Sequence, residues 1–176
     1  CFPYAGGASY VFNGWQEKLG KDVEVVSVEY PGRGRRIREK PLLCMKSLID
    51  QMISEIAGAT DKPIVFLGHS LGALIAFELF LTMQRRSMST PLHLIVSGCN
   101  PPLKIQIKEG IHKLPDKQFI EELVDMGGMD EQILNNVELM SLLTPIVKAD
   151  FSIYESYIYN RMEKVSSVIT LISGSS

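Results

Sequence analysis

The sequence is poor in cysteine, and the few it has are widely spaced. Its three cysteines stand at Cys1, Cys44 and Cys99. A disulfide framework needs paired cysteines, and a zinc site needs clustered ligands. The spacing therefore predicts no disulfide and no metal, and we expect three reduced, mostly buried thiols.

The sequence also lacks a charge excess and a long apolar run. Its net charge of -2 argues against a nucleic-acid-binding protein, which usually carries a basic excess. The longest apolar stretch, Leu71 to Met83, contains Glu78 and is shorter than the ~20 residues of a membrane helix. We predict a cytoplasmic protein that binds neither nucleic acid nor membrane. No secretory signal is visible, although the first residue is Cys1, which leaves a removed segment open.

What the sequence does have is an alternation of apolar strands and helices, over a length that suits one domain. Cys1 to Tyr4 is predicted as the tail of a strand. Further strands are predicted at Val23–Tyr30, Pro63–Leu67, Leu92–Ser97 and Val165–Ser173, and helices at Val11–Leu19, Leu48–Ala57 and Leu71–Gln84. Short continuous apolar strands are typical of a parallel sheet buried on both faces. We predict an α/β fold, with a mostly parallel sheet and helices on both faces, in a single domain over 1–176.

The alternation stops between residues 101 and 162, where helical patterns dominate. Helices are predicted at Asp116–Met126, Glu131–Leu143 and Ile146–Ile158, with Pro145 marking the start of the last one. An all-helical stretch between two sheet strands is most simply a lid over the carboxyl edge of the sheet.

A Gly-x-Ser-x-Gly motif lies between an apolar strand and a long helix. It reads Gly68-His69-Ser70-Leu71-Gly72. In this context the motif indicates a nucleophile elbow, a tight turn that exposes the serine hydroxyl above the sheet edge. The helix that follows favours the negative charge of an acyl-transfer intermediate. We predict Ser70 as the catalytic nucleophile.

A small-residue loop near the start of the chain suits the second half of an oxyanion hole. Such a hole needs two backbone N–H groups aimed at one point. One comes from the residue after the nucleophile, here Leu71, and the other from a loop after an earlier strand. The loop Phe2-Pro3-Tyr4-Ala5-Gly6-Gly7 supplies Ala5 or a neighbouring glycine.

Several motifs together resemble the type II thioesterases, the editing enzymes of non-ribosomal peptide and polyketide synthesis, which are related to medium-chain fatty-acid synthase thioesterases. Besides the elbow, the similarity is carried by these segments in order: Phe2 to Gly7, Pro31-Gly32-Arg33-Gly34, Leu114-Pro115-Asp116, Met126 to Met129, and Leu143 to Asp150. The resemblance implies the α/β-hydrolase fold, incomplete here at both ends. It also implies hydrolysis of acyl thioesters on the phosphopantetheine arm of acyl or peptidyl carrier proteins, through an acyl-enzyme on Ser70.

The resemblance further implies that the helical insertion shapes the acyl pocket. Lid or pocket residues are then Met126, Met129, Met140, Leu142 and Leu143, although each of them equally suits plain packing of the lid on the core. We expect a monomer without a cofactor of its own, because the partner carrier protein bears the phosphopantetheine.

The acid and the histidine of a Ser-acid-His triad are not found in the expected order. His69 lies inside the elbow, His93 opens a strand at the amino edge, and His112 lies at the entry to the lid. Asp130 and Asp150 suit surface or capping positions in the lid. We therefore expect the acid and the histidine beyond Ser176, and little catalysis from residues 1–176 alone.

The sequence leaves open the role of one basic cluster and two alternatives to the thioesterase function. Arg33, Arg35, Arg36 and Arg38 form either a docking patch for acidic carrier proteins or a solvated loop. The alternatives to a thioesterase are a small-molecule esterase of the same fold and a catalytically inactive carrier-binding module. The glycine-rich loop after Tyr4 favours a thioesterase, because lipases more often carry a His-Gly-Gly-Gly-type loop there.

Overall fold

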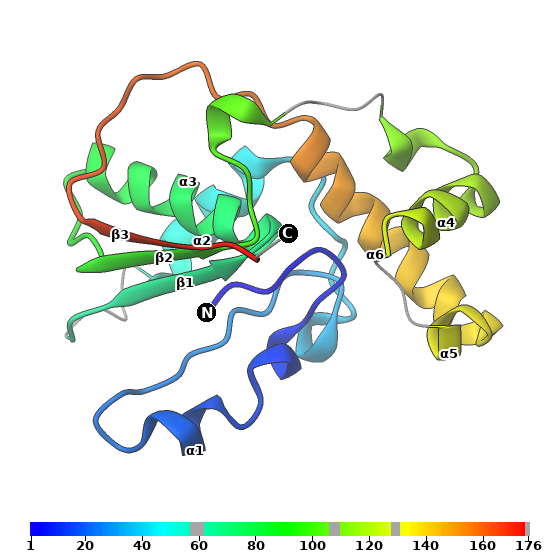
Figure 1. Cartoon of the computed structure of the whole chain (residues 1–176), viewed down its shortest axis with the longest axis horizontal. Coiled ribbons are helices and arrows are strands. Elements are labelled where there is room, and N and C mark those ends of the chain that lie inside the picture. Colours follow the sequence, from blue (N-terminus) through cyan, green and yellow to red (C-terminus); the bar gives the residue numbers. More distant parts are fainter. Residues whose placement is uncertain (57–61, 106–109, 128–130, 175–176) are drawn as a thin grey trace.

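The sheet is parallel, and its strands point toward a separate group of helices. The computed structural model describes residues 1–56, 62–105, 110–127 and 131–174. In this part of the chain the sheet has the order β1 (Val65–His69), β2 (His93–Ser97) and β3 (Val168–Ile172). All pairs are parallel, with Val65 opposite His93 and His93 opposite Val168. Parallel neighbours need long crossovers, and here these carry helices (Figure 1).

Helix α3 (Leu71–Arg85) is the centre of the core. It packs against β1 and β2, and α2 (Met45–Ile56) packs against it in turn. Leu74, Leu79 and Phe80 are each no more than 1% exposed. A helix that is apolar on nearly all sides has to be buried on nearly all sides, as the sequence predicts for Leu71–Gln84.

The segments before α2 differ from the predicted pattern. Phe2 makes one bridge to Gly68, so the predicted strand tail pairs beside β1, but Pro3 has no N–H with which to extend a ladder. The predicted strand Val23–Tyr30 is not part of the sheet ladder. It runs extended and is held at Val28, whose N–H donates to Cys1 O at 2.9 Å.

The predicted helix Val11–Leu19 is also wrong as one unit. Gly14 adopts a left-handed φ of +78° and separates a short turn, η1 (Ser9–Phe12), from α1 (Trp15–Leu19). A residue in that conformation cannot continue a right-handed helix. Another short turn, η2 (Gly34–Arg36), follows the extended segment.

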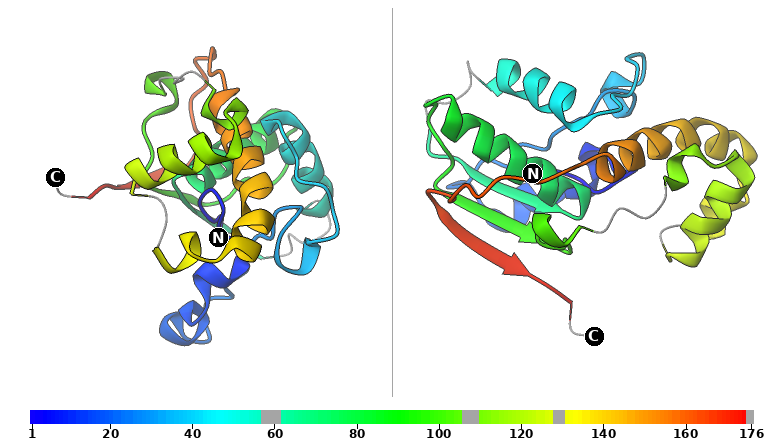
Figure 2. Two further views of the ribbon diagram at one scale, coloured as in Figure 1. Left: turned by 90° about the vertical axis from the view of Figure 1, so that its right-hand side faces the viewer. Right: turned by 90° about the horizontal axis from the view of Figure 1, so that it is seen from above.

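Beyond the carboxyl ends of the strands lies the helical stretch that the sequence predicts as a lid (Figures 1 and 2). It comprises η3 (Pro102–Lys104), η4 (Ile111–Lys113), α4 (Asp116–Asp125), α5 (Glu131–Leu134) and α6 (Val137–Glu155). Pro145 does not start a helix, because α6 runs through it. Met140 and Val147 are buried on either side of the proline, so tertiary packing keeps the helix continuous across it.

The helical stretch has its own small core. Ile111, Phe119, Leu123 and Val147 form a cluster distinct from the main one around α3. The Phe119 and Phe151 rings meet edge to face, with centroids 5.6 Å apart. The described residues thus form two apolar cores, one around α3 and one within the helical group.

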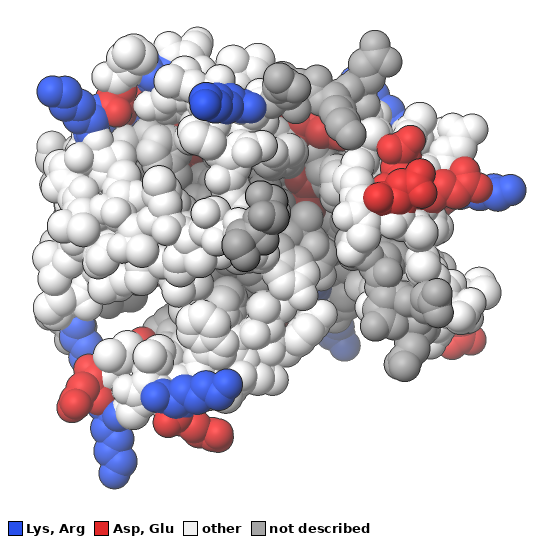
Figure 3. All heavy atoms as spheres, viewed as in Figure 1, with Lys and Arg blue, Asp and Glu red and all other residues white. Residues whose placement is uncertain are grey.

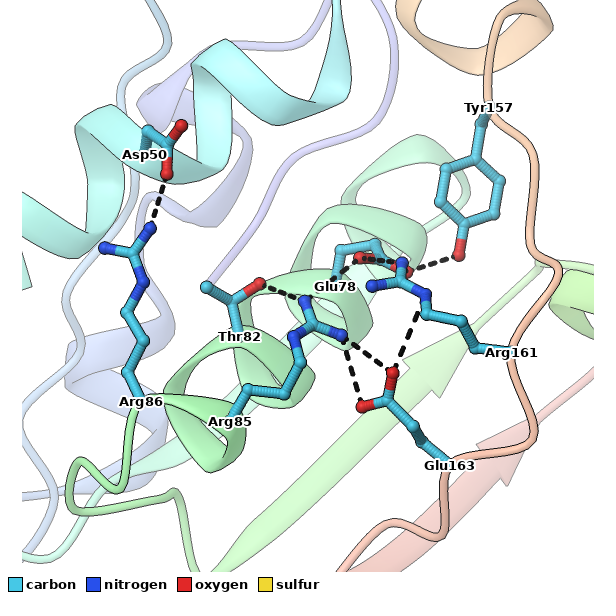
Figure 4. Close-up of polar contacts among 8 residues, drawn as sticks. All are labelled: Asp50, Glu78, Thr82, Arg85, Arg86, Tyr157, Arg161 and Glu163. Atoms are coloured by element: carbon cyan, nitrogen blue, oxygen red, sulfur yellow. Dashed lines mark hydrogen bonds and ion pairs between the residues drawn. The ribbon is translucent and has the colours of Figure 1, made fainter.

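The connection from α6 to β3 is tied to α3 by charged groups (Figure 4). Glu78, only 4% exposed, accepts hydrogen bonds from the Tyr157 hydroxyl at 2.6 Å and from Arg161 Nη2 at 2.9 Å. Arg85 pairs with Glu163 at 3.0 Å. Burial, and after it the Glu78 carboxylate, raises the pKa of Tyr157. The two charged residues of α3, Glu78 and Arg85, therefore both hold the connection from α6 to β3.

The outer face of the sheet carries exposed apolar side chains. Val65 and Val168, which lie in the same register row, are 52% and 63% exposed. Figure 3 shows few charged side chains over the sheet, with the charges gathered at the margins. None of the helices described is long and apolar enough to cross a membrane.

The prediction of mostly buried cysteines is wrong. All three thiols are free, but Cys44 is exposed, while Cys1 and Cys99 are half-buried. Cys44 precedes α2, where the Ser47 hydroxyl and backbone N–H groups lower the pKa of its thiol. Burial has the opposite effect and raises the pKa of Cys99.

Candidate active site

Ser70 occupies a strained turn between β1 and α3. Its φ of +53° and ψ of -118° fall outside the usual regions for a residue with a side chain, and such a conformation costs on the order of 1–3 kcal/mol. The Ser70 N–H donates to Ser97 O at 2.8 Å, which fixes the turn to the end of β2. The hydroxyl does not cap α3, and it makes no hydrogen bond to the residues described. A half-buried hydroxyl is thereby left available at the sheet edge.

Two glycines make this turn sterically feasible. A Cβ on Gly68 would lie 2.3 Å from Gly72 O, and one on Gly72 would lie 2.1 Å from Phe2 O. Both contacts are with backbone, which cannot swing aside. The motif therefore needs glycine on both sides of Ser70 for close packing of strand, helix and the amino-terminal segment.

The same packing brings the two oxyanion-hole candidates to one edge. Phe2 N–H donates to Leu67 O at 2.8 Å, so the loop that contains Ala5 leaves the sheet beside Ser70. Leu71 opens α3, where the first backbone N–H groups have no intrahelical acceptor. Neither the Leu71 nor the Ala5 N–H is bonded within the described part of the chain. Both are available to a ligand.

A buried ion pair braces the Ala5 loop from two sides. Arg33 and Asp150 are 4% and 2% exposed, and their side chains form paired hydrogen bonds of 2.7 Å each. Asp150 Oδ2 also accepts from the Gly6 N–H at 2.7 Å, and Arg33 Nη1 donates to Gly7 O at 3.1 Å. The Arg33 guanidinium lies over the Tyr30 ring at 5.1 Å. Burial, and after it the charge of Asp150, raises the pKa of Tyr30.

This pair overturns two sequence-based interpretations. Arg33 belongs neither to a docking patch nor to a solvated loop, and Asp150 is not a surface or capping group. A signal was present, because Asp150 interrupts an apolar stripe of α6 between Val147 and Ile153. A charge on a buried stripe needs a partner, but the sequence does not reveal one 117 positions away.

The rest of the basic cluster lies at the surface. Arg35 and Arg38 are exposed, and Arg36 pairs with Glu39 at 2.7 Å and with Glu55 at 3.3 Å.

The three histidines are all engaged away from the Ser70 hydroxyl. His69 Nδ1 lies 3.1 Å from the Ser97 hydroxyl, and His93 Nε2 lies 2.8 Å from the Thr170 hydroxyl. His112 Nδ1 contacts the buried Glu155 carboxylate, which also accepts from the Ile111 N–H at 3.0 Å. His112 and Glu155 thus hold η4 against α6.

The predicted lid residues are not gathered in one place. Met126, 45% exposed, lines a cleft of about 770 Å³ together with Phe151 and Tyr154 of α6. Met140 is buried, Leu143 half-buried and Leu142 exposed, and none of them lines that cleft. Met129 and Asp130 lie outside the described residues. In the segments that are described, no cluster of three or more metal-ligating side chains occurs.

Comparison with known proteins places the chain in a family. The thioesterase domain family matches residues 1–172. The chain is 41% identical to the gramicidin S biosynthesis protein GrsT of Aneurinibacillus migulanus, over 99% of the chain and 68% of that protein. It is 32% identical to the thioesterase PikA5 of Streptomyces venezuelae, over 99% of the chain and 62% of that protein. The chain thus spans about two thirds of the length of these relatives.

Solved structures agree with this result. The RedJ thioesterase from the prodiginine biosynthetic pathway in Streptomyces coelicolor superposes with a TM-score of 0.88 and 34% identity, over 97% of this chain and 64% of that one. YbtT, a type II thioesterase of the yersiniabactin pathway, superposes with a TM-score of 0.84 and 35% identity, over 98% and 71%. The chain belongs to the thioesterase domain family and has its α/β-hydrolase fold.

Proposed function

We propose that this chain forms the nucleophile-bearing part of a cytoplasmic type II thioesterase. It would hydrolyse acyl groups from the phosphopantetheine arm of carrier proteins in non-ribosomal peptide or polyketide synthesis. The proposal is supported by the family membership and by relatives that are named for gramicidin S biosynthesis and as a thioesterase. The observation that carries it is the backbone of Ser70, a serine held at φ +53° at the head of a buried helix.

In this mechanism the Ser70 hydroxyl attacks the thioester carbonyl. The carbonyl oxygen becomes an oxyanion, which the N–H groups of Leu71 and Ala5 bind, and the positive end of α3 stabilises its charge. Collapse of the intermediate breaks the carbon–sulfur bond, and the phosphopantetheine thiol leaves with a proton. Water then attacks the acyl-serine, releases the acid and restores Ser70.

The proton transfers need a base, and the proposal places it outside residues 1–176. The described histidines contact Ser97, Thr170 and Glu155, not Ser70. Relatives are about half as long again as this chain, since it covers 68% of GrsT. Residues 1–176 alone are then expected to turn over little thioester.

The test is Ser70→Ala in the protein with its natural termini. Because the nucleophile is lost, hydrolysis of an acetylated carrier protein should fall by about 10⁴-fold or more, measured by mass spectrometry of the carrier. Carrier binding, measured by calorimetry, should be unchanged.

Ser87→Ala is the matched control. Ser87 is the other non-glycine residue with a positive φ among the described residues, at +52°, and it lies past the far end of α3. Its substitution should leave turnover unchanged. Equal turnover by wild type and Ser70→Ala would refute the nucleophile assignment, and carrier binding without any turnover by wild type would favour an inactive binding module.

A further inference from the structure

The loop that presents Ala5 is a tight turn whose central peptide has a defined orientation. The Gly7 N–H donates to Tyr4 O at 2.9 Å, and Gly6 has a φ of +76°. This φ at the third position is typical of a type II turn. In a trans peptide the C=O and the N–H point in opposite directions. Because Tyr4 O faces into the turn, the Ala5 N–H faces out of it, free for a ligand.

A type I turn would orient the Ala5–Gly6 peptide the other way. Types I and II differ by rotation of the central peptide, which exchanges the positions of its C=O and its N–H. In the structure the Gly6 N–H faces the Asp150 carboxylate at 2.7 Å. The rotated peptide would present the Ala5 carbonyl oxygen to that carboxylate, and the two would repel each other. The charge of Asp150 therefore favours the type II turn, and the bond to the Gly6 N–H ties this turn to α6. The Ala5 N–H belongs to the preceding peptide and faces out of the turn in both types, so the bond fixes the place of this N–H and not its direction relative to the turn.

Arg33 in turn fixes the Asp150 carboxylate and the far side of the loop. It binds both oxygens of Asp150 and, through Nη1, the Gly7 carbonyl oxygen. A Cβ on Gly6 would lie 3.0 Å from Val147 Cγ2, so the turn also lies directly against α6. The turn is thus held between Arg33 and one face of the long helix.

We propose that Asp150 and Arg33 are positioning residues for the oxyanion hole, and that they hold the Tyr4–Gly7 turn, and with it the Ala5 N–H, in place at the sheet edge. The inference rests on the function proposed above. A buried ion pair contributes little net stability, because desolvation of the two charges offsets their attraction. A role in holding the turn explains why such a pair is buried against the loop that contains Ala5. It also links the position of α6 to the geometry of the hole.

Two double variants separate this role from stability. Arg33→Met with Asp150→Leu removes both charges and the acceptor for Gly6, whereas Arg33→Met with Asp150→Asn removes the charges but keeps an acceptor oxygen. Apolar replacement of both partners of a buried ion pair is commonly tolerated, so the leucine variant should fold. The asparagine variant keeps the shape of Asp150 and the acceptor for the Gly6 N–H, and circular dichroism and urea unfolding check the folding of both. If the leucine variant does not fold, alanine at position 150 in the same background carries the same expectation.

We expect kcat to fall about 30-fold in the leucine variant, since loss of a whole oxyanion donor costs roughly 10²–10³-fold. The asparagine variant loses the Arg33 bond to Gly7 O but keeps an acceptor for the Gly6 N–H, so its kcat should fall less, about fivefold, and KM should change little in both variants. A trifluoromethyl ketone analogue of the acyl-pantetheine forms an oxyanion on Ser70. It should bind the leucine variant more weakly by the same factor as kcat, while an unreactive thioether analogue should bind all three proteins equally.

The outcomes are distinct for the two proposals. If Ser70→Ala retains wild-type turnover, the proposed function fails, and this inference fails with it. If Ser70→Ala is inactive but a folded leucine variant has the kcat of the asparagine variant, only the positioning role is overturned. Equal weakening of both analogues would also overturn it, because that result indicates general damage to the site.

Discussion

At the scale of single residues, close backbone contacts restrict which side chains the elbow accepts. Gly72 illustrates this, because an added methyl group would meet Phe2 O at 2.1 Å and Pro3 O at 2.6 Å. We expect Gly72→Ala to lower the free energy of unfolding by about 3 kcal/mol, the cost of forcing extra atoms into a packed interior. Urea denaturation measures the effect.

Gly174→Ala is the control for that substitution. A Cβ at position 174 meets nothing within 4 Å, so its stability should match wild type. If both alanine variants unfold at the same urea concentration, the close approach of the amino-terminal segment to α3 does not require glycine at position 72.

The sequence predicted well the structure around those residues whose signal lies in neighbouring positions of the chain. Ser70 and its glycines stand next to each other, and the strand and helix around them follow from neighbouring apolar residues. The ion pair of Arg33 and Asp150 depends on the fold bringing distant segments together, and no local pattern encodes that. Gly14, in contrast, is a local signal, because a glycine inside a helical pattern can end the helix. The helical spacing of the apolar residues on both sides of it nevertheless predicted one helix.

At the scale of elements, α6 carries more constraints than its sequence pattern suggests. It supplies Asp150 to the Ala5 loop, Phe151 to the cleft and Val147 to the small core, and it does so across an internal proline. The sequence predicted two helices because proline disfavours a helix interior. Burial on both sides of Pro145 requires one rigid helix, and this requirement overrides the local preference.

The cost of that proline can be measured. Pro145 cannot donate to Ser141 O, and its ring crowds that carbonyl, so Pro145→Ala should restore the bond and raise the free energy of unfolding by about 2 kcal/mol. Pro115→Ala is the control, because Pro115 precedes the first turn of α4, where no intrahelical N–H is needed. A loss of stability in Pro145→Ala would show instead that the packing of α6 depends on the shape that proline imposes.

At the scale of the whole molecule, the two apolar cores differ greatly in size. The main cluster surrounds α3 and draws on the strands, α2 and the end of α6, whereas the small one has four buried members, one of which is Phe119. Elements with few buried apolar contacts open with a lower free energy than the whole domain. The part of the helical group around Phe119, which includes η4 and α4, should therefore open while the sheet and α3 stay folded, as a lid over the sheet edge requires.

Hydrogen exchange tests this division through Phe119→Ala. Phe119 is fully buried in the small core, and truncating a buried phenylalanine costs about 3–5 kcal/mol. If the small core opens on its own, amide exchange in α4 and η4 should accelerate by about 100-fold or more, while α3 amides keep their wild-type protection. Leu79→Ala, in the main core, should instead accelerate exchange of the α3 amides, because it lowers global stability. Equal acceleration of α3 and α4 in Phe119→Ala would mean that the two cores unfold together, and a lid that moves independently of the sheet would then be excluded.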